Sequence, residues 1–187
     1  SYNTCEKLGS TRDDAAGEAF DKVARVIGLG YPGGPKVDKA AKNGDKDAVV
    51  FKRVYLEQGS YDFSFSGLKT AALNYINTER QAGRDINVND VAAGFQEAIV
   101  EVLVDKAVGA ALEFDQKRIV MAGGVASNSR LRELISERAG EHGIEICAPS
   151  PVLCTDNGVM IACSAYYAYQ AGERSGLDLD ADPSLEF

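Results

Sequence analysis

Histidine and tryptophan are nearly absent from this sequence: its 187 residues include one histidine and no tryptophan. The single histidine, His142, lies between Glu141 and Gly143 in a polar turn, where a surface position is expected. An HExxH metalloprotease helix needs two histidines, and no Ser–His–Asp arrangement is present. These absences argue against a self-contained hydrolase, and they leave no complete metal site in the sequence.

Cysteine spacing and the length of apolar runs exclude two further classes. The four cysteines show no CxxC spacing. Cys147, Cys154 and Cys163 lie in or beside apolar segments, which favours buried, reduced thiols over disulfides. No apolar run reaches transmembrane length, and the N-terminal SYNTCEKLGS is neither a signal peptide nor a basic transit segment. We therefore expect a cytoplasmic protein without membrane contact.

Basic residues are also few, with 20 Lys and Arg against 28 Asp and Glu and a net charge of −8. They form only small groups, at Lys52–Arg53, Lys117–Arg118 and Arg130–Arg132. Because nucleic-acid affinity depends on neutralising phosphates, the chain is not expected to hold RNA unaided. If its substrate is RNA, positive surface must come from elsewhere.

What the sequence does contain is an acidic helix followed by a loop rich in glycine and proline, DDAAGEAFDKVARVIGLGYPGGPKVD, over residues 13–38. Apolar residues recur there at helical spacing, and a separate face carries Asp14, Glu18 and Asp21. The segment from Gly28 to Pro35 is too rich in turn residues to continue the helix. Carboxylates beside accessible backbone are typical of a binding loop.

Each of these features also has a structural explanation. Asp21 can pair with Arg25 one turn further on. Asp13 or Asp14 can cap the helix at its N-terminus, and Gly28 can end it. The residues alone leave both the ligand and the structural interpretation open.

The remaining pattern predicts an α/β domain. Between the loop and the second half we expect a short helix over 37–42, an extended segment over 49–55, a half-buried strand over 61–66, a helix from Ser66 and a long helix from Val91 to about Glu113. A repeating unit follows, with a buried strand over 118–121, a helix over 127–139, a strand over 144–147 and a helix over 156–171. Strand–helix–strand order predicts a right-handed crossover and parallel pairing.

Two motifs lie at the ends of these predicted strands. In Met121–Asn128, MAGGVASN, the paired Gly123 and Gly124 let backbone approach a nucleotide, and the helix N-terminus favours phosphate. Asn128 can bond sugar hydroxyls or a base edge. A tight turn with Ser127 or Asn128 as helix cap explains the same residues.

The second motif is Cys154–Gly158, CTDNG, at the head of the final helix. Thr155 or Asp156 can serve as its N-cap. Alternatively, Asp156 is a carboxylate placed to bind a metal ion.

Together these segments closely resemble the C-terminal part of the TsaD family, formerly called O-sialoglycoprotein endopeptidases or glycoproteases. The resemblance is carried, in order, by DDAAGEAFDKVARVIGLGYPGGP, FSFSGLKTA, MAGGVASNSRLRELI and LCTDNGVMIA. It implies the actin-like ATPase fold of sugar kinases and heat-shock chaperones, in which two α/β lobes close around a nucleotide. It also implies an acyltransferase of tRNA modification, which moves threonylcarbamoyl from threonylcarbamoyl-adenylate to the adenosine next to the anticodon.

The resemblance assigns roles to individual residues. Asp21, Gly34, Asp38 and Asn128 match positions that bind the adenylate, beside the Gly123–Gly124 pair. Asp156 matches a ligand of one divalent metal ion, iron or zinc. The other metal ligands of the family are two histidines of an HxxxH motif in the N-terminal lobe, and this sequence has no such motif.

We therefore expect a C-terminal lobe whose N-terminal lobe is missing, inactive alone and dependent on helper proteins of the same pathway. Its predicted divisions are a nucleotide-side helix and loop (1–48), a helical insertion (49–116), a strand–helix repeat (117–175) and a tail (176–187). Two alternatives remain at this point: another ATPase or kinase of the actin-like superfamily, or a non-catalytic interaction module. Nothing in the residues supports the older metallo-glycoprotease label.

Overall fold

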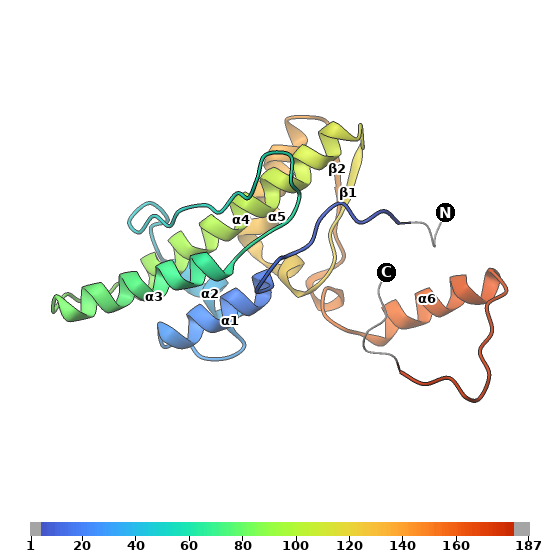
Figure 1. Ribbon diagram of the computed structural model, residues 1–187, viewed down its shortest axis with the longest axis horizontal. Helices are drawn as coiled ribbons and strands as arrows, with labels where there is room; N and C mark the ends of the chain where they lie inside the picture. Colours follow the sequence, from blue (N-terminus) through green and yellow to red (C-terminus); the bar gives the residue numbers. More distant parts are fainter. Residues whose placement is uncertain (1–4, 182–187) are drawn as a thin grey trace.

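The computed structural model describes residues 5–181 and has an elongated shape in which a long central helix is flanked by shorter ones (Figure 1). The elements, in order, are α1 (Ala16–Val26), α2 (Gly33–Ala41), α3 (Ser66–Gln81), α4 (Val88–Glu113), β1 (Arg118–Val120), the 3₁₀ turn η1 (Gly124–Ser127), α5 (Ser129–Gly140), β2 (Glu145–Cys147), the 3₁₀ turn η2 (Pro151–Leu153) and α6 (Gly158–Gln170). No helix among residues 5–181 is long and apolar enough to cross a bilayer.

Helix α1 forms where the apolar spacing predicted it and buries Phe20 and Val23 almost completely. It ends at Ile27, and Gly28 follows with a φ of +83°, a left-handed conformation that glycine adopts without strain. Helix α2 then packs back against α1. It begins at Gly33 rather than at Val37 as predicted, so the second half of the glycine–proline segment is the first turn of a helix.

Helix α4 is the spine of the molecule. Asn87 caps it by accepting a hydrogen bond from Asn89 N, and its 26 residues contribute buried side chains on every face. Its first half, through Ile99, belongs to a core cluster shared with α1, α2 and α3. Its second half, from Val100, belongs to a separate cluster with η1 and α5. The two halves of the core therefore meet inside a single helix.

Strands β1 and β2 pair in parallel, with Arg118 opposite Glu145 and Val120 opposite Cys147. The predicted strand–helix–strand unit is confirmed, with α5 as its crossover helix. The prediction that the first strand is buried holds only on one face, since Met121, directly after β1, is buried whereas Val120 is 72% exposed. In the described part of the chain, the other face of this two-stranded sheet is left uncovered.

Helix α6 is apolar in composition, yet it buries none of its residues and projects away from the body (Figure 1). Val159 and Ile161 are both more than half exposed. The predicted burial of Cys163 is wrong for the same reason, because the helix that carries it contacts neither core cluster, whereas Cys154 is buried as predicted.

The segment predicted as a strand over 61–66 forms a single parallel bridge between Thr11 and Phe63. The carbonyl of Asp62, which would bond a neighbouring strand, instead accepts a hydrogen bond from the Lys106 ammonium. The division of the chain at residues 48, 116 and 175 stays a prediction, and the end of the predicted tail, 182–187, lies outside the described residues.

Candidate functional site

The predicted site segments meet at the point where α1, α2, η1 and α5 come together. A methyl group built on Gly17 of α1 would lie 3.5 Å from Val125 Cγ2 of η1, an ordinary van der Waals distance, so these two elements lie next to each other. Asp38, in the second half of α2, accepts hydrogen bonds from Ser129 at the N-terminus of α5. Residues more than 90 positions apart in the sequence thus form one surface.

Asp21 links α1 to the start of α2. Its Oδ1 accepts a hydrogen bond from Gly33 N at 2.6 Å, which satisfies a free backbone donor of the first turn of α2. The alternative ion pair with Arg25 does not form within the described residues. Gly34 follows in the same turn, and a methyl group there would meet no protein atom within 4 Å. Packing therefore does not require glycine at Gly34, and the space beside it is open.

Asp38 links α2 to the start of α5. Its Oδ1 accepts hydrogen bonds from Ser129 Oγ at 2.7 Å and from Ser129 N at 3.3 Å. The Oδ2 atom lies 3.6 Å from the exposed Lys42 ammonium. The Asp38 side chain is 17% exposed, so the carboxylate is held in a fixed position while remaining reachable from solvent.

Asn128 is the N-cap of α5, as one of the two predicted interpretations had it. Its Oδ1 accepts from Leu131 N at 2.9 Å, and its Nδ2 donates to Gln96 Oε1 at 2.8 Å. Asn128 is 7% exposed and Gln96 is 5% exposed. Before Asn128, Gly123 has a φ of +85°, and the exposed Gly123–Gly124 pair opens the turn η1.

A cavity of about 420 Å³ lies between α2, α4 and α5, and its lining includes Ser129, the partner of Asp38, and Gln96, the partner of Asn128. Its volume is in the range of small-molecule sites. Five of its six lining residues have polar or charged side chains, and the residues are Ala41, Lys42, Gln96, Ser129, Arg130 and Glu133.

Arg130, in the wall of this cavity, forms a two-point ion pair with Glu97, with Nε to Oε2 at 2.7 Å and Nη2 to Oε1 at 2.8 Å. The Glu97 side chain is only 4% exposed. Burial by itself raises the pKa of Glu97, but the hydrogen bonds and charge of Arg130, together with nearby Lys46, lower it below its ordinary value overall. The pair therefore stays ionised and ties α5 to the spine helix.

Asp156 lies on the exposed link between η2 and α6. The N-cap of α6 is Asn157, which accepts from Met160 N at 3.0 Å, so the predicted cap at Thr155 or Asp156 is wrong. Thr155 nevertheless approaches the glycine turn, since its Cγ2 would lie 4.0 Å from a methyl group on Gly124. Asp156 makes no hydrogen bond or ion pair with other described residues.

A family model described as TsaD, tRNA N6-adenosine threonylcarbamoyltransferase, matches residues 1–163. The chain belongs to the TsaD family. That match includes every residue that the sequence assigned to the site, from Asp21 to Asp156.

Curated relatives of the TsaD family support this membership. The tRNA N6-adenosine threonylcarbamoyltransferase of Clostridium botulinum (strain Hall) is 52% identical over 185 residues, which are 99% of this chain and 54% of the relative. The protein of the same name from Clostridioides difficile (strain 630) is 53% identical over 99% of this chain and 55% of its own length. The chain thus spans about half the length of these relatives.

A solved structure supports the fold. The crystal structure of T. kodakarensis HypF matches with a TM-score of 0.64 and 23% sequence identity, over 85% of this chain and 20% of that chain. Together with the family membership, it assigns the chain to the α/β lobe architecture of the actin-like ATPase type.

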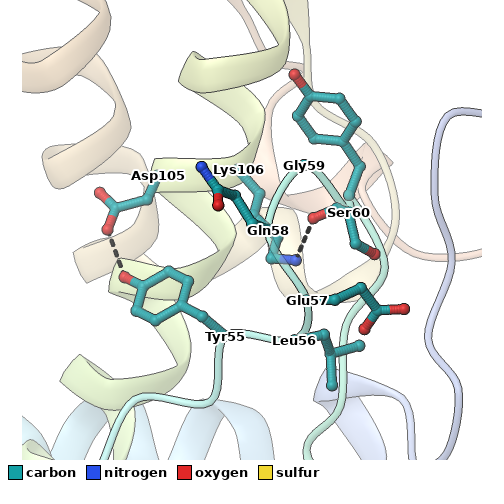
Figure 2. Close-up of a pocket in the computed structure, with 9 residues that line it drawn as sticks. Tyr55, Leu56, Glu57, Gln58, Gly59, Ser60, Asp105 and Lys106 are labelled. Carbon is teal, nitrogen blue, oxygen red and sulfur yellow. Dashed lines mark hydrogen bonds between the residues drawn. The ribbon is translucent and has the colours of Figure 1, made fainter.

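A second cavity of this TsaD family chain, about 270 Å³, lies between the segment Tyr55–Tyr61 and the second half of α4 (Figure 2). In Figure 2 the Tyr55 hydroxyl points to the carboxylate of Asp105, and Lys106 reaches the Ser60 carbonyl. Burial lowers the pKa of Lys106, whose ammonium donates to the carbonyls of Ser60 and Asp62. None of the predicted site residues lines this cavity, and its lysine is engaged in holding the loop.

Two adjacent aspartates have roles that the sequence did not reveal. Asp13 was considered as a cap of α1, but it caps α3 instead, accepting from Phe65 N at 2.8 Å and Ser66 N at 3.2 Å. Asp14 bridges two lysines, Lys22 at 2.8 Å and Lys69 at 3.0 Å, which lower its pKa. Apart from Lys22, these partners lie more than 50 positions away in the sequence, so no local pattern indicates the contacts.

Proposed function

We propose that this chain forms the nucleotide-side wall of a tRNA N6-adenosine threonylcarbamoyltransferase. In this reaction the exocyclic amine of the adenosine next to the anticodon attacks the carbamoyl carbon of threonylcarbamoyl-adenylate, and AMP leaves. The observation that carries the proposal is the convergence of Asp21, Gly34, Asp38 and Asn128 on one surface. The names of the relatives that match nearly the full chain support the activity.

Each residue has a chemical role in this proposal. Asp21 Oδ2 makes no hydrogen bond with other described residues, and Asp38 is partly exposed, so both carboxylates can accept hydrogen bonds from ribose hydroxyls. Gly34 and the Gly123–Gly124 pair leave room for ligand atoms close to backbone. These groups bind and orient the adenylate, and none of them is assigned as a general base.

A metal ion, iron or zinc, is implied by the family resemblance, but this chain offers a poor fit for it. Residues 5–181 contain no group of three His, Cys, Asp or Glu side chains that could hold a metal. Asp156 supplies one exposed carboxylate next to the glycine turn. We propose that it is one ligand of a metal site whose other ligands come from outside residues 5–181. No step of the reaction is derived through the metal.

Contact with tRNA also needs more than this chain. With a net charge of −8, it has no overall excess of positive charge to neutralise phosphates. We propose that the tRNA is held by other parts of the complete protein and by helper proteins of the same cytoplasmic pathway.

The Asp38→Asn variant of the complete gene product is expected to bind ADP about tenfold more weakly or worse, because a hydrogen bond to a charged acceptor contributes about 1.5–3 kcal/mol. Asparagine keeps an Oδ1 that accepts from Ser129, so the link between α2 and α5 is preserved. Titration calorimetry measures the affinity. Asp47→Asn is the matched control, because Asp47 is 75% exposed and pairs with the exposed Lys46. Equal affinities for Asp38→Asn and wild type would contradict the role of Asp38.

The Asp156→Ala variant of the complete gene product is expected to contain less bound metal and to lose threonylcarbamoyl transfer in parallel. Elemental analysis of the purified protein gives the first quantity, and mass spectrometry of nucleosides from unmodified tRNA incubated with threonylcarbamoyl-adenylate gives the second. The exposed Asp178→Ala is the control, with unchanged values for both. If Asp156→Ala contained as much metal as the wild type, Asp156 would not be a metal ligand. The proposed roles of Asp21, Gly34, Asp38 and Asn128 in binding the adenylate would not be affected.

A further inference from the structure

The orientation of the Asn128 side chain is determined by backbone. The atom that faces Leu131 N at 2.9 Å must be an acceptor, because a backbone N–H can only donate. The amide oxygen of Asn128 therefore points to α5, and its Nδ2 points in the other direction, to Gln96.

The orientation of Gln96 follows from that of Asn128. An Nδ2 group is a donor, so Gln96 must present its Oε1, at a distance of 2.8 Å. This leaves Gln96 Nε2 without a hydrogen bond to any other described residue. Every fully buried side-chain nitrogen or oxygen in the described part has a hydrogen-bond partner. Gln96 Nε2 has none in this part, so this atom is not fully buried. Gln96 is one of the residues that line the 420 Å³ cavity. The chain of hydrogen bonds thus runs in one direction, from Leu131 N to the cavity.

We propose that Gln96 is a positioning residue of the nucleotide site, which acts by holding the amide of Asn128. The inference rests on the proposed function. Gln96 Oε1 accepts one hydrogen of Asn128 Nδ2, and the other hydrogen has no acceptor among the described residues, so it is the one that this proposal assigns to the ligand. The ligand group that meets Asn128 is accordingly an acceptor, a ring nitrogen or an oxygen of the nucleotide.

The surroundings of Gln96 make it suited to this task. It projects from the spine helix α4 and is 5% exposed, next to Phe95, which is completely buried. On its other side, Glu97 is tied by two hydrogen bonds to Arg130 of α5, which fixes the separation of α4 and α5 where Gln96 meets Asn128. A side chain on such a rigid support loses little freedom when a ligand binds.

The test is a double-mutant cycle in the complete gene product, with ADP as the probe and titration calorimetry as the measurement. Gln96→Met has a similar length but neither accepts nor donates. Asn128→Ser keeps a helix cap, because serine and asparagine cap equally well, and removes Nδ2. If Gln96 acts through Asn128, Gln96→Met weakens ADP binding about tenfold in the wild-type background and less than twofold in the Asn128→Ser background.

A conservative variant separates positioning from a packing role. Gln96→Glu retains an acceptor for Asn128 Nδ2 and is expected to bind ADP within about threefold of wild type. Melting temperatures verify that each variant is folded. If Gln96→Met is unfolded, Gln96→Asn replaces it, since its amide is one methylene too short to reach Asn128.

Three outcomes overturn the inference: additive losses in the cycle, unchanged affinity in Gln96→Met, or equal losses in Gln96→Glu and Gln96→Met. Each of these leaves the proposed function standing as long as the wild-type protein binds ADP. A wild-type protein that binds no ADP would instead overturn the proposed function itself.

Discussion

The Gly94→Ala variant is expected to be less stable than the wild type by about 3 kcal/mol, at the upper end of the usual cost of overpacking a core. Gly94 lies in the first half of α4, where its Cα faces the backbone of Val49. A methyl group there would overlap the Val49 carbonyl oxygen and also approach that of Lys46. The obstacle is the backbone carbonyl of Val49, so relief requires the chain around Val49 to move off the helix. Urea denaturation followed by circular dichroism measures the difference.

The same helix provides a matched control at Gly109. A methyl group there meets nothing within 4 Å, and the residue has helical neighbours on both sides. Gly109→Ala is expected to stabilise the protein by about 0.5–1 kcal/mol, because alanine favours the helix over the unfolded chain. Equal effects of the two substitutions would mean that α4 does not pack against the 46–49 segment in this way.

The Arg130→Met variant is expected to lose about 3–5 kcal/mol of stability. Removing one partner of a buried ion pair leaves the other charge without compensation. Glu97 would remain at 4% side-chain exposure, with the Lys46 ammonium 3.9 Å away as its remaining cation. The matched control is Arg118→Met, because the Arg118–Glu145 pair is about 60% exposed on both sides and such pairs contribute about 0–1 kcal/mol.

The pH dependence of this loss checks its cause. The pKa of Glu97 is lowered in the folded protein from its ordinary value of 4.5. Its stabilising contribution is therefore present above pH 4.5 and is lost as the pH falls through the lower, folded pKa. In Arg130→Met the burial of Glu97 is no longer opposed by its main partner, and protonation relieves the cost. The difference between variant and wild type should thus shrink below pH 4.5, and a constant difference would speak against the ion pair.

Periodicity predicted those elements whose structure depends on local pattern. The apolar stripe of α1, the long run of α4 and the strand–helix–strand unit around α5 each appear close to the predicted place. The 61–66 segment was mispredicted because alternation indicates a strand only if a neighbour pairs with it. Here just Phe63 pairs, with Thr11, while Lys106 takes the Asp62 carbonyl.

Motifs in the sequence indicate which residues belong to the candidate site, and their binding roles stay a prediction, but the motifs do not indicate the contacts that these residues make within the protein. Asp38 and Asn128 were chosen from motifs, and the structure joins them to α5 through Ser129 and Leu131. Gln96 was missed, although a signal existed: it is a polar residue inside the apolar run of α4. Such a residue needs a hydrogen-bond partner when buried, yet the sequence does not tell which distant residue provides it.

The shared spine helix also bears on how the molecule folds and unfolds. Asp21 and Asp38 lie on α1 and α2, the helices that pack in the core cluster around the first half of α4. The glycine turn and α5 belong to the cluster around its second half. A helix of 26 residues cannot melt at one end without weakening the hydrogen-bonded ladder next to it. The two clusters should therefore unfold as one cooperative unit, so that the site is either assembled on both sides or absent.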